Sequence, residues 1–98
     1  MKFKDEQIQK HFDRIMSLQV EGSSDDQRPV MALMDAYGFF GRSYGWQSQY
    51  VQEIIEHLLS PELRPALRDW YKKFGDRMNP VALEFREHLS KLSGEKFG

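Results

Sequence analysis

Cysteine is absent from the 98 residues of this sequence. Its absence excludes disulfides, iron–sulfur clusters, thiolate zinc sites and cysteine nucleophiles. Long apolar runs are also missing, since none approaches the roughly 20 residues that a membrane-spanning helix needs. The opening stretch, MKFKDEQIQK, is charged and holds no apolar segment. We therefore expect no signal peptide, no membrane partner and a cytoplasmic location.

An excess of charge of either sign is missing too. The chain has 14 Lys and Arg against 15 Asp and Glu, which leaves a net charge of −1. No overall field therefore attracts nucleic acid or an anionic membrane, and any such binding must come from a local patch. Aromatic residues, in contrast, are plentiful at 13%, so we expect a core built around rings.

Apolar residues recur at helical spacing along nearly the whole chain. We predict an all-α fold, a compact single domain over residues 1–98 with about five short helices arranged as a bundle or an orthogonal array. Residues 93–98 are expected to form a frayed tail. The predicted core consists of Phe12, Leu33, Tyr50, Ile54, Leu58, Leu67, Trp70 and Phe85.

Proline and glycine divide the chain into these helices, because proline suits a first helical turn and glycine a helix end. The helix that starts at Trp46 has the broadest apolar stripe, and we expect it to be the central one. Ser60 is the predicted N-cap of the next helix. Expected first-turn prolines are Pro29, Pro61 and Pro80, and expected helix ends are Gly38 or Gly41, Gly75 and Gly94.

The stretch GFFGRSYGW, from Gly38 to Trp46, is unlike any other part of the sequence. Its glycines match neither a Walker loop nor a dinucleotide fingerprint, and no strand precedes them. We expect a helix end, a glycine turn and a helix start, with Trp46 and one phenylalanine packed inward. So short a connection cannot bury all four rings, so Phe39, Arg42 and Tyr44 are candidate partner-binding residues with hot-spot composition. The simpler alternative is an aromatic-packed corner.

Two Glu–His pairs stand at i, i+4 spacing, Glu53 with His57 and Glu84 with His88, so each pair places two possible metal ligands on one helix face. They do not match the Glu-x-x-His pattern of di-iron bundles, and a solvated helix face explains them more simply. Ser43 lies in GRSYG without the strand that a nucleophile elbow requires. We predict no metal site, no cofactor and no enzymatic activity.

A basic face recurs every four residues in the segment SPELRPALRDWYKKFG. It consists of Arg64, Arg68 and Lys72, extended by Lys73 and Arg77. This face has three possible neighbours: nucleic acid in a helix-turn-helix arrangement, an acidic patch on a protein, or solvent alone. Acidic residues interrupt the stripe, and a dedicated nucleic-acid binder normally carries a net basic charge.

The aromatic and basic segments GFFGRSYGW and SPELRPALRDWYKKFG, together with the chain length, are similar to small bacteriophage accessory proteins, among them the anti-RecBCD proteins of lambdoid phages. The resemblance implies binding to a host DNA recombination nuclease and modulation of its activity. Our leading hypothesis is therefore a non-enzymatic protein-binding modulator that inhibits or redirects a host DNA-processing or defence complex. The alternative is a small helical DNA- or RNA-binding regulator that uses the basic face.

Overall fold

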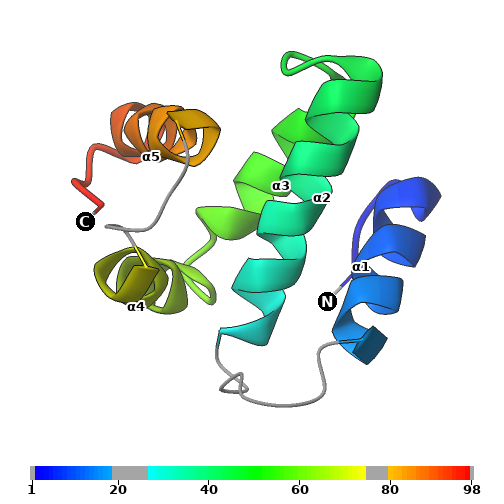
Figure 1. Ribbon diagram of the computed structural model, residues 1–98, viewed down its shortest axis with the longest axis horizontal. Helices are drawn as coiled ribbons and strands as arrows, with labels where there is room; N and C mark the ends of the chain where they lie inside the picture. Colours follow the sequence, from blue (N-terminus) through cyan, green and yellow to red (C-terminus); the bar gives the residue numbers. More distant parts are fainter. Residues whose placement is uncertain (1, 19–26, 75–79, 98) are drawn as a thin grey trace.

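The computed structural model describes residues 2–18, 27–74 and 80–97, and all regular structure in these ranges is helical (Figure 1). This confirms the all-α prediction. No helix in the described ranges is both long enough and apolar enough to cross a membrane. The five helices are α1 (Glu6–Leu18), α2 (Arg28–Tyr44), α3 (Gln49–Leu58), α4 (Arg64–Phe74) and α5 (Pro80–Ser93).

Helix α2 is the centre of the molecule. It packs against α1, α3 and α4, and α1 lies on the opposite side of it from α4 and α5 (Figure 1). The expectation of a central helix starting at Trp46 is wrong, because α3 starts only at Gln49 and is the shortest of the five. The buried residues of α2 are Val30, Ala32, Leu33, Ala36, Phe40 and Gly41.

Helices α4 and α5 are seen nearly end-on in the view that shows α1 and α2 lengthwise, so the fold is an orthogonal array (Figure 1). An aromatic stack attaches α5 to α2: the rings of Tyr37 and Phe85 lie 3.5 Å apart at 12°. The joint between α3 and α4 is tight, and Ser60 does not cap α4 as expected. Its hydroxyl instead donates to the carbonyl of His57, at the end of α3.

The predicted core is largely confirmed. Six of its residues, Phe12, Leu33, Ile54, Leu58, Leu67 and Phe85, are buried. Tyr50 and Trp70 are corrections, since both are only partly buried and pack against the margin of the core. On α4 the fully buried ring belongs to Tyr71. Trp70 and Tyr71 are adjacent positions, about 100° apart around the helix, so the two rings point in different directions and Tyr71 is the one that faces the core.

The C-terminal segment is held to the fold, which corrects the expected frayed tail for residues 93–97. Phe97 is buried, and its N–H donates to the Ser90 hydroxyl at 3.2 Å. The carboxylate of Glu95 accepts hydrogen bonds from the Arg68 guanidinium on α4. Gly94, with a φ of 72°, ends α5 as predicted and turns the chain back.

Truncation of a core leucine tests this assignment. Leu58 is fully buried on α3, so Leu58→Ala should lower the free energy of unfolding by about 2–5 kcal/mol. Leu92 is an exposed leucine on α5, and the matched Leu92→Ala variant should change it by less than about 0.5 kcal/mol. Denaturant unfolding of both variants measures the difference. Equal losses would show that the burial pattern is wrong.

The Arg68–Glu95 pair should make stability depend on pH at acid values. The hydrogen bond from Arg68 lowers the pKa of Glu95 below its ordinary value of 4.5. A carboxyl with a lowered pKa in the folded state stabilises the protein above 4.5, and this contribution is lost as pH falls through the folded value. Wild type should therefore be more stable than Glu95→Gln near neutral pH, and thermal unfolding should show the difference shrinking below pH 4.5. A difference that stays constant across this range would contradict the pairing.

Candidate protein-binding site

The stretch GFFGRSYGW is mostly helical. Helix α2 continues to Tyr44, so the prediction that it ends at Gly38 or Gly41 is wrong. The end is at Gly45, whose φ of 99° is a conformation that glycine adopts without strain. Its N–H donates to the carbonyl of Gly41 at 3.0 Å. Phe39 and Tyr44 therefore project from a regular helix rather than from a loop.

Trp46 covers this end of α2 from outside. Its side chain is 41% exposed, which corrects the expectation that it packs into the core. It lies against Gly41, where an added Cβ would overlap its six-membered ring, and its ring is 4.9 Å from that of Tyr37. Gly41 thus serves a close approach between ring and backbone, and it does not end the helix.

Phe40 is the phenylalanine that joins the core, at 1% exposure. Adjacent helix positions differ by about 100°, so burial of Phe40 turns Phe39 outward. Phe39 is 47% and Tyr44 51% exposed, and Arg42 is exposed as well. The predicted exposure of these three side chains is confirmed. The ring of Phe40 contacts the rings of His11, Phe39, Tyr44 and Tyr50.

A groove of about 290 Å³ runs between α1 and α2 at this position. Phe39 and Tyr44 both line it, and the Tyr44 hydroxyl donates to the side-chain oxygen of Gln7 at 3.2 Å. Arg42 is exposed on the same helix but does not line the groove, and its guanidinium lies over Gly38. We call this surface the aromatic face. It consists of the lining residues Gln7, Lys10, His11, Arg14, Phe39 and Tyr44, together with Arg42 of α2.

His11 forms the floor of the aromatic face and is buried. Its Nε2 lies 2.8 Å from the Asp35 carboxylate, and its Nδ1 lies 3.1 Å from Nη2 of Arg14. A guanidinium can only donate, so Nδ1 accepts from Arg14 and Nε2–H donates to Asp35. The ring of Phe39 is stacked on this imidazole at 4.9 Å and 23°. One buried side chain therefore positions an aromatic ring and a guanidinium next to each other.

Sequence reasoning found Phe39, Arg42 and Tyr44 but missed the contribution of α1. Lys10 and Arg14 are four residues apart and so share one side of that helix. This spacing was the available signal, and His11 lies between them. The helix that Lys10 and Arg14 contact is decided by the packing of α1 on α2, and local spacing does not predict that packing.

The predicted basic face of α4 is partly used inside the fold. Arg64 donates from Nε and Nη2 to the carbonyl of Leu59, at 3.2 and 2.8 Å, and so caps the end of α3. Arg68 is paired with Glu95. Lys72 and Lys73 are exposed, and Arg77 lies outside the described residues. The five cations therefore do not form the free stripe that the sequence suggested.

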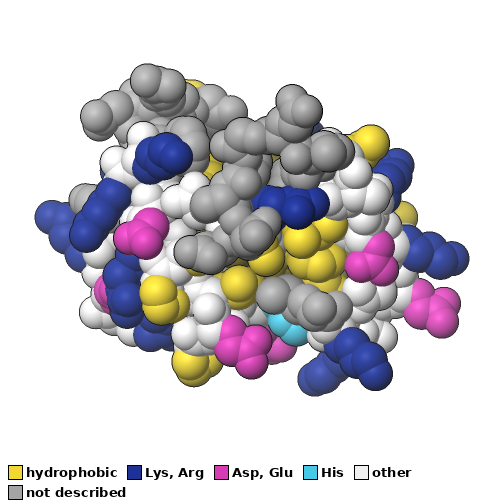
Figure 2. Space-filling view, turned by 90° about the horizontal axis from the view of Figure 1, so that it is seen from below, with side chains coloured by type: hydrophobic (Ala, Val, Ile, Leu, Met, Phe, Trp, Pro, Cys, Tyr) yellow, Lys and Arg dark blue, Asp and Glu magenta, His cyan; other side chains and the backbone are white. Residues whose placement is uncertain are grey.

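Positive side chains are also dispersed over the surface. Figure 2 shows Lys and Arg at both margins of one face, with Asp and Glu among them and hydrophobic side chains between. Among the described side chains in Figure 2, acidic, hydrophobic and uncharged groups separate the Lys and Arg at the left margin from those at the right. A protein that follows a nucleic-acid backbone needs a continuous basic track.

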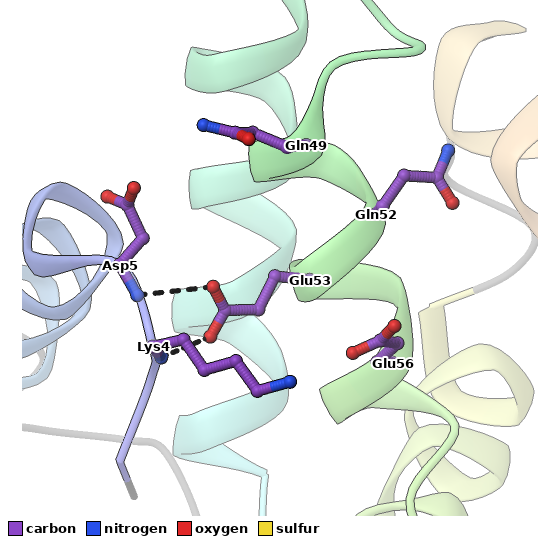
Figure 3. A pocket seen from close by; sticks show the side chains of 6 residues that line it. All are labelled: Lys4, Asp5, Gln49, Gln52, Glu53 and Glu56. Carbon is purple, nitrogen blue, oxygen red and sulfur yellow. Dashed lines mark hydrogen bonds between the residues drawn. The ribbon is translucent and has the colours of Figure 1, made fainter.

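Glu53 and His57 make the expected i, i+4 contact, with 3.6 Å between Oε2 and Nε2, but the carboxylate is largely buried and not solvated. The Glu53 carboxylate accepts the backbone N–H groups of Lys4 and Asp5, and so ties the N-terminal segment to α3 (Figure 3). The His57 ring packs on Phe3 at 4.3 Å. The hollow of about 410 Å³ around Glu53 is lined by charged and amide side chains, so no hydrophobic residue is present there to anchor a ligand.

The second pair, Glu84 and His88, is exposed on α5. It borders a hollow of about 390 Å³ with Tyr37 and Trp46. Burial, and secondarily the charge of Glu84, raises the pKa of Tyr37 above 10.0. Within the described ranges, His, Asp and Glu side chains nowhere gather in a group of three that could hold a metal ion.

Comparison of the chain with models of protein families, with curated proteins and with solved structures finds no match.

Two glycines of α2 offer a matched test of the geometry around Trp46. Gly38→Ala adds a Cβ in ordinary contact with Arg42, at 3.8 Å, and should stabilise the helix by about 0.5–1 kcal/mol. Gly41→Ala must displace the Trp46 ring, and overpacking of this kind costs about 1–3 kcal/mol. In a Trp70→Phe background, tryptophan emission should shift to the red in Gly41→Ala alone. Equal stability and unchanged emission in both variants would contradict the packing of Trp46.

Proposed function

We propose that this chain is a non-enzymatic protein that binds a partner protein through the aromatic face and modulates its activity. The observation that carries the proposal is the exposure of two large rings, Phe39 and Tyr44, on one groove beside cationic side chains. Tyrosine and arginine are enriched among residues that dominate binding energy. Rings fixed on a regular helix also lose little conformational freedom on binding.

A DNA- or RNA-binding regulator is the weaker candidate. Its support in the sequence was the basic face of α4, and Arg64 and Arg68 of that face are engaged with Leu59 and Glu95. The net charge of −1 provides no general attraction to phosphates. Salt dependence separates the two candidates, because binding that neutralises several phosphates weakens steeply with salt.

The resemblance to phage accessory proteins makes the first partner to test a host DNA-processing complex. Under this proposal the protein occupies a surface of that complex and inhibits or redirects it. This chain does not need to catalyse a reaction. It changes the activity of its partner if it binds one conformational state of the partner more tightly than another.

Capture from a bacterial lysate tests the proposal with matched variants. The Phe39→Ala/Tyr44→Ala double variant removes two exposed rings, so it should fold normally and still lose the captured protein. Leu92→Ala removes an exposed leucine from α5, on the far side of α2 from α1, and should retain it. With the purified partner, the double variant should bind at least about tenfold more weakly, or 1.4 kcal/mol.

Nuclease treatment of the lysate supplies the second control. A protein partner stays bound after treatment, whereas a protein bridged by nucleic acid is lost. Capture that is equal for wild type and the double variant, or that disappears with nuclease, would contradict the proposed function.

A further inference from the structure

The cations of the aromatic face lack acidic partners. Among the described residues no carboxylate lies within ion-pair distance of Lys10, Arg14 or Arg42, whereas Arg68 is paired with Glu95. The groove itself is lined by two cations and by no carboxylate. A chain with more acidic than basic residues thus presents a locally positive groove.

Two carboxylates next to lining residues, Asp35 and Asp13, accept hydrogen bonds from side chains other than Lys10 and Arg14. Asp35, whose side chain is 54% exposed, accepts from Nε2–H of His11. Asp13, on α1, accepts from the side-chain amide of Gln9 at 3.1 Å. Lys10 and Arg14 are both exposed at the groove, so their charged groups are open to a ligand.

Arg14 is held in place for such a ligand. One of its terminal nitrogens donates to Nδ1 of His11, and His11 is fixed by Asp35 and by the stacked ring of Phe39. A guanidinium has five N–H donors, so several remain for a second acceptor. Its planar fork matches the two oxygens of a carboxylate, and an already oriented fork loses less entropy on binding.

We propose, on the basis of the protein-binding function above, that the occupant of the aromatic face is an acidic segment of the partner protein. Its Asp or Glu side chains meet Lys10 and Arg14, and an aromatic or aliphatic side chain next to them packs on Phe39 and Tyr44. Charge complementarity selects the acidic residues, and burial against the two rings supplies the apolar anchor.

Single-stranded nucleic acid also combines negative charge with stacking rings, so it is the competing ligand. It needs cations that follow its backbone over several nucleotides. The aromatic face offers three cations, Lys10, Arg14 and Arg42, and helix α1 also carries the acidic residues Glu6 and Asp13. So few cations give weak binding at physiological salt, so the protein segment is the favoured occupant.

The test is selection from a random peptide library on immobilised full-length protein, with counterselection on Phe39→Ala/Tyr44→Ala. Peptides that depend on the rings should be net acidic and carry an aromatic or leucine residue. Lys10→Glu/Arg14→Glu should weaken their binding by about tenfold or more. The matched reversal Lys72→Glu/Lys91→Glu, at exposed lysines of α4 and α5, should leave it unchanged. Peptides with Glu→Lys changes should regain affinity for Lys10→Glu/Arg14→Glu.

Each outcome is informative. Ring-dependent peptides that are neutral or basic would overturn the acidic segment and leave the proposed function standing. A library that yields no ring-dependent peptide would count against both. An oligothymidine that binds more tightly than the selected peptides, with steep salt dependence and loss in Lys10→Glu/Arg14→Glu, would assign the face to nucleic acid.

Discussion

Burial of one ring, that of Phe40, determines the arrangement of the α1–α2 side of this protein. The ring contacts His11 on α1 and Tyr50 on α3, so it joins three helices at one point. Because Phe40 is turned inward, Phe39 must point outward, and Tyr44, one helical turn later, lies over the edge of the Phe40 ring. The exposed rings are therefore a consequence of the core rather than an addition to it.

The distribution of charge follows from how the fold uses its own side chains. Helix α4 carries more cations in sequence, yet Arg64 caps α3 and Arg68 anchors the C-terminal segment through Glu95. Helix α1 carries fewer cations, but Lys10 and Arg14 line the groove, and among the described residues no carboxylate lies within ion-pair distance of either. Counting charges along helices pointed to α4, whereas the fold engages Arg64 and Arg68 internally and leaves Lys10 and Arg14 at the groove.

Helical periodicity was sufficient to predict the fold class and most of the core. The exposure of Phe39 and Tyr44 was predicted from a short connection, but the segment is helical, and burial of Phe40 is what turns Phe39 outward. The errors concern contacts between residues far apart in sequence. Gly41 was read as a helix end, although it makes room for the Trp46 ring.

The contribution of α1 to the aromatic face could not be predicted from local spacing for the same reason. His11 reaches Asp35 across two helices, 24 residues along the chain. Arg68 and Glu95 are separated by 27 residues. A local pattern predicts which side of a helix a residue occupies, but the packing of helices decides which partner it meets.

A prebuilt aromatic face depends on His11, which orients Phe39 and Arg14 in the free protein. The tautomer of its imidazole is therefore the most direct test, and proton–nitrogen correlation spectra at neutral pH report it. The account predicts a ring protonated on Nε2 alone, with a slowly exchanging proton donated to Asp35, and an unprotonated Nδ1 that accepts from Arg14. A proton on Nδ1, in either the other neutral tautomer or the imidazolium, would contradict the account, because Arg14 could not then donate to that atom.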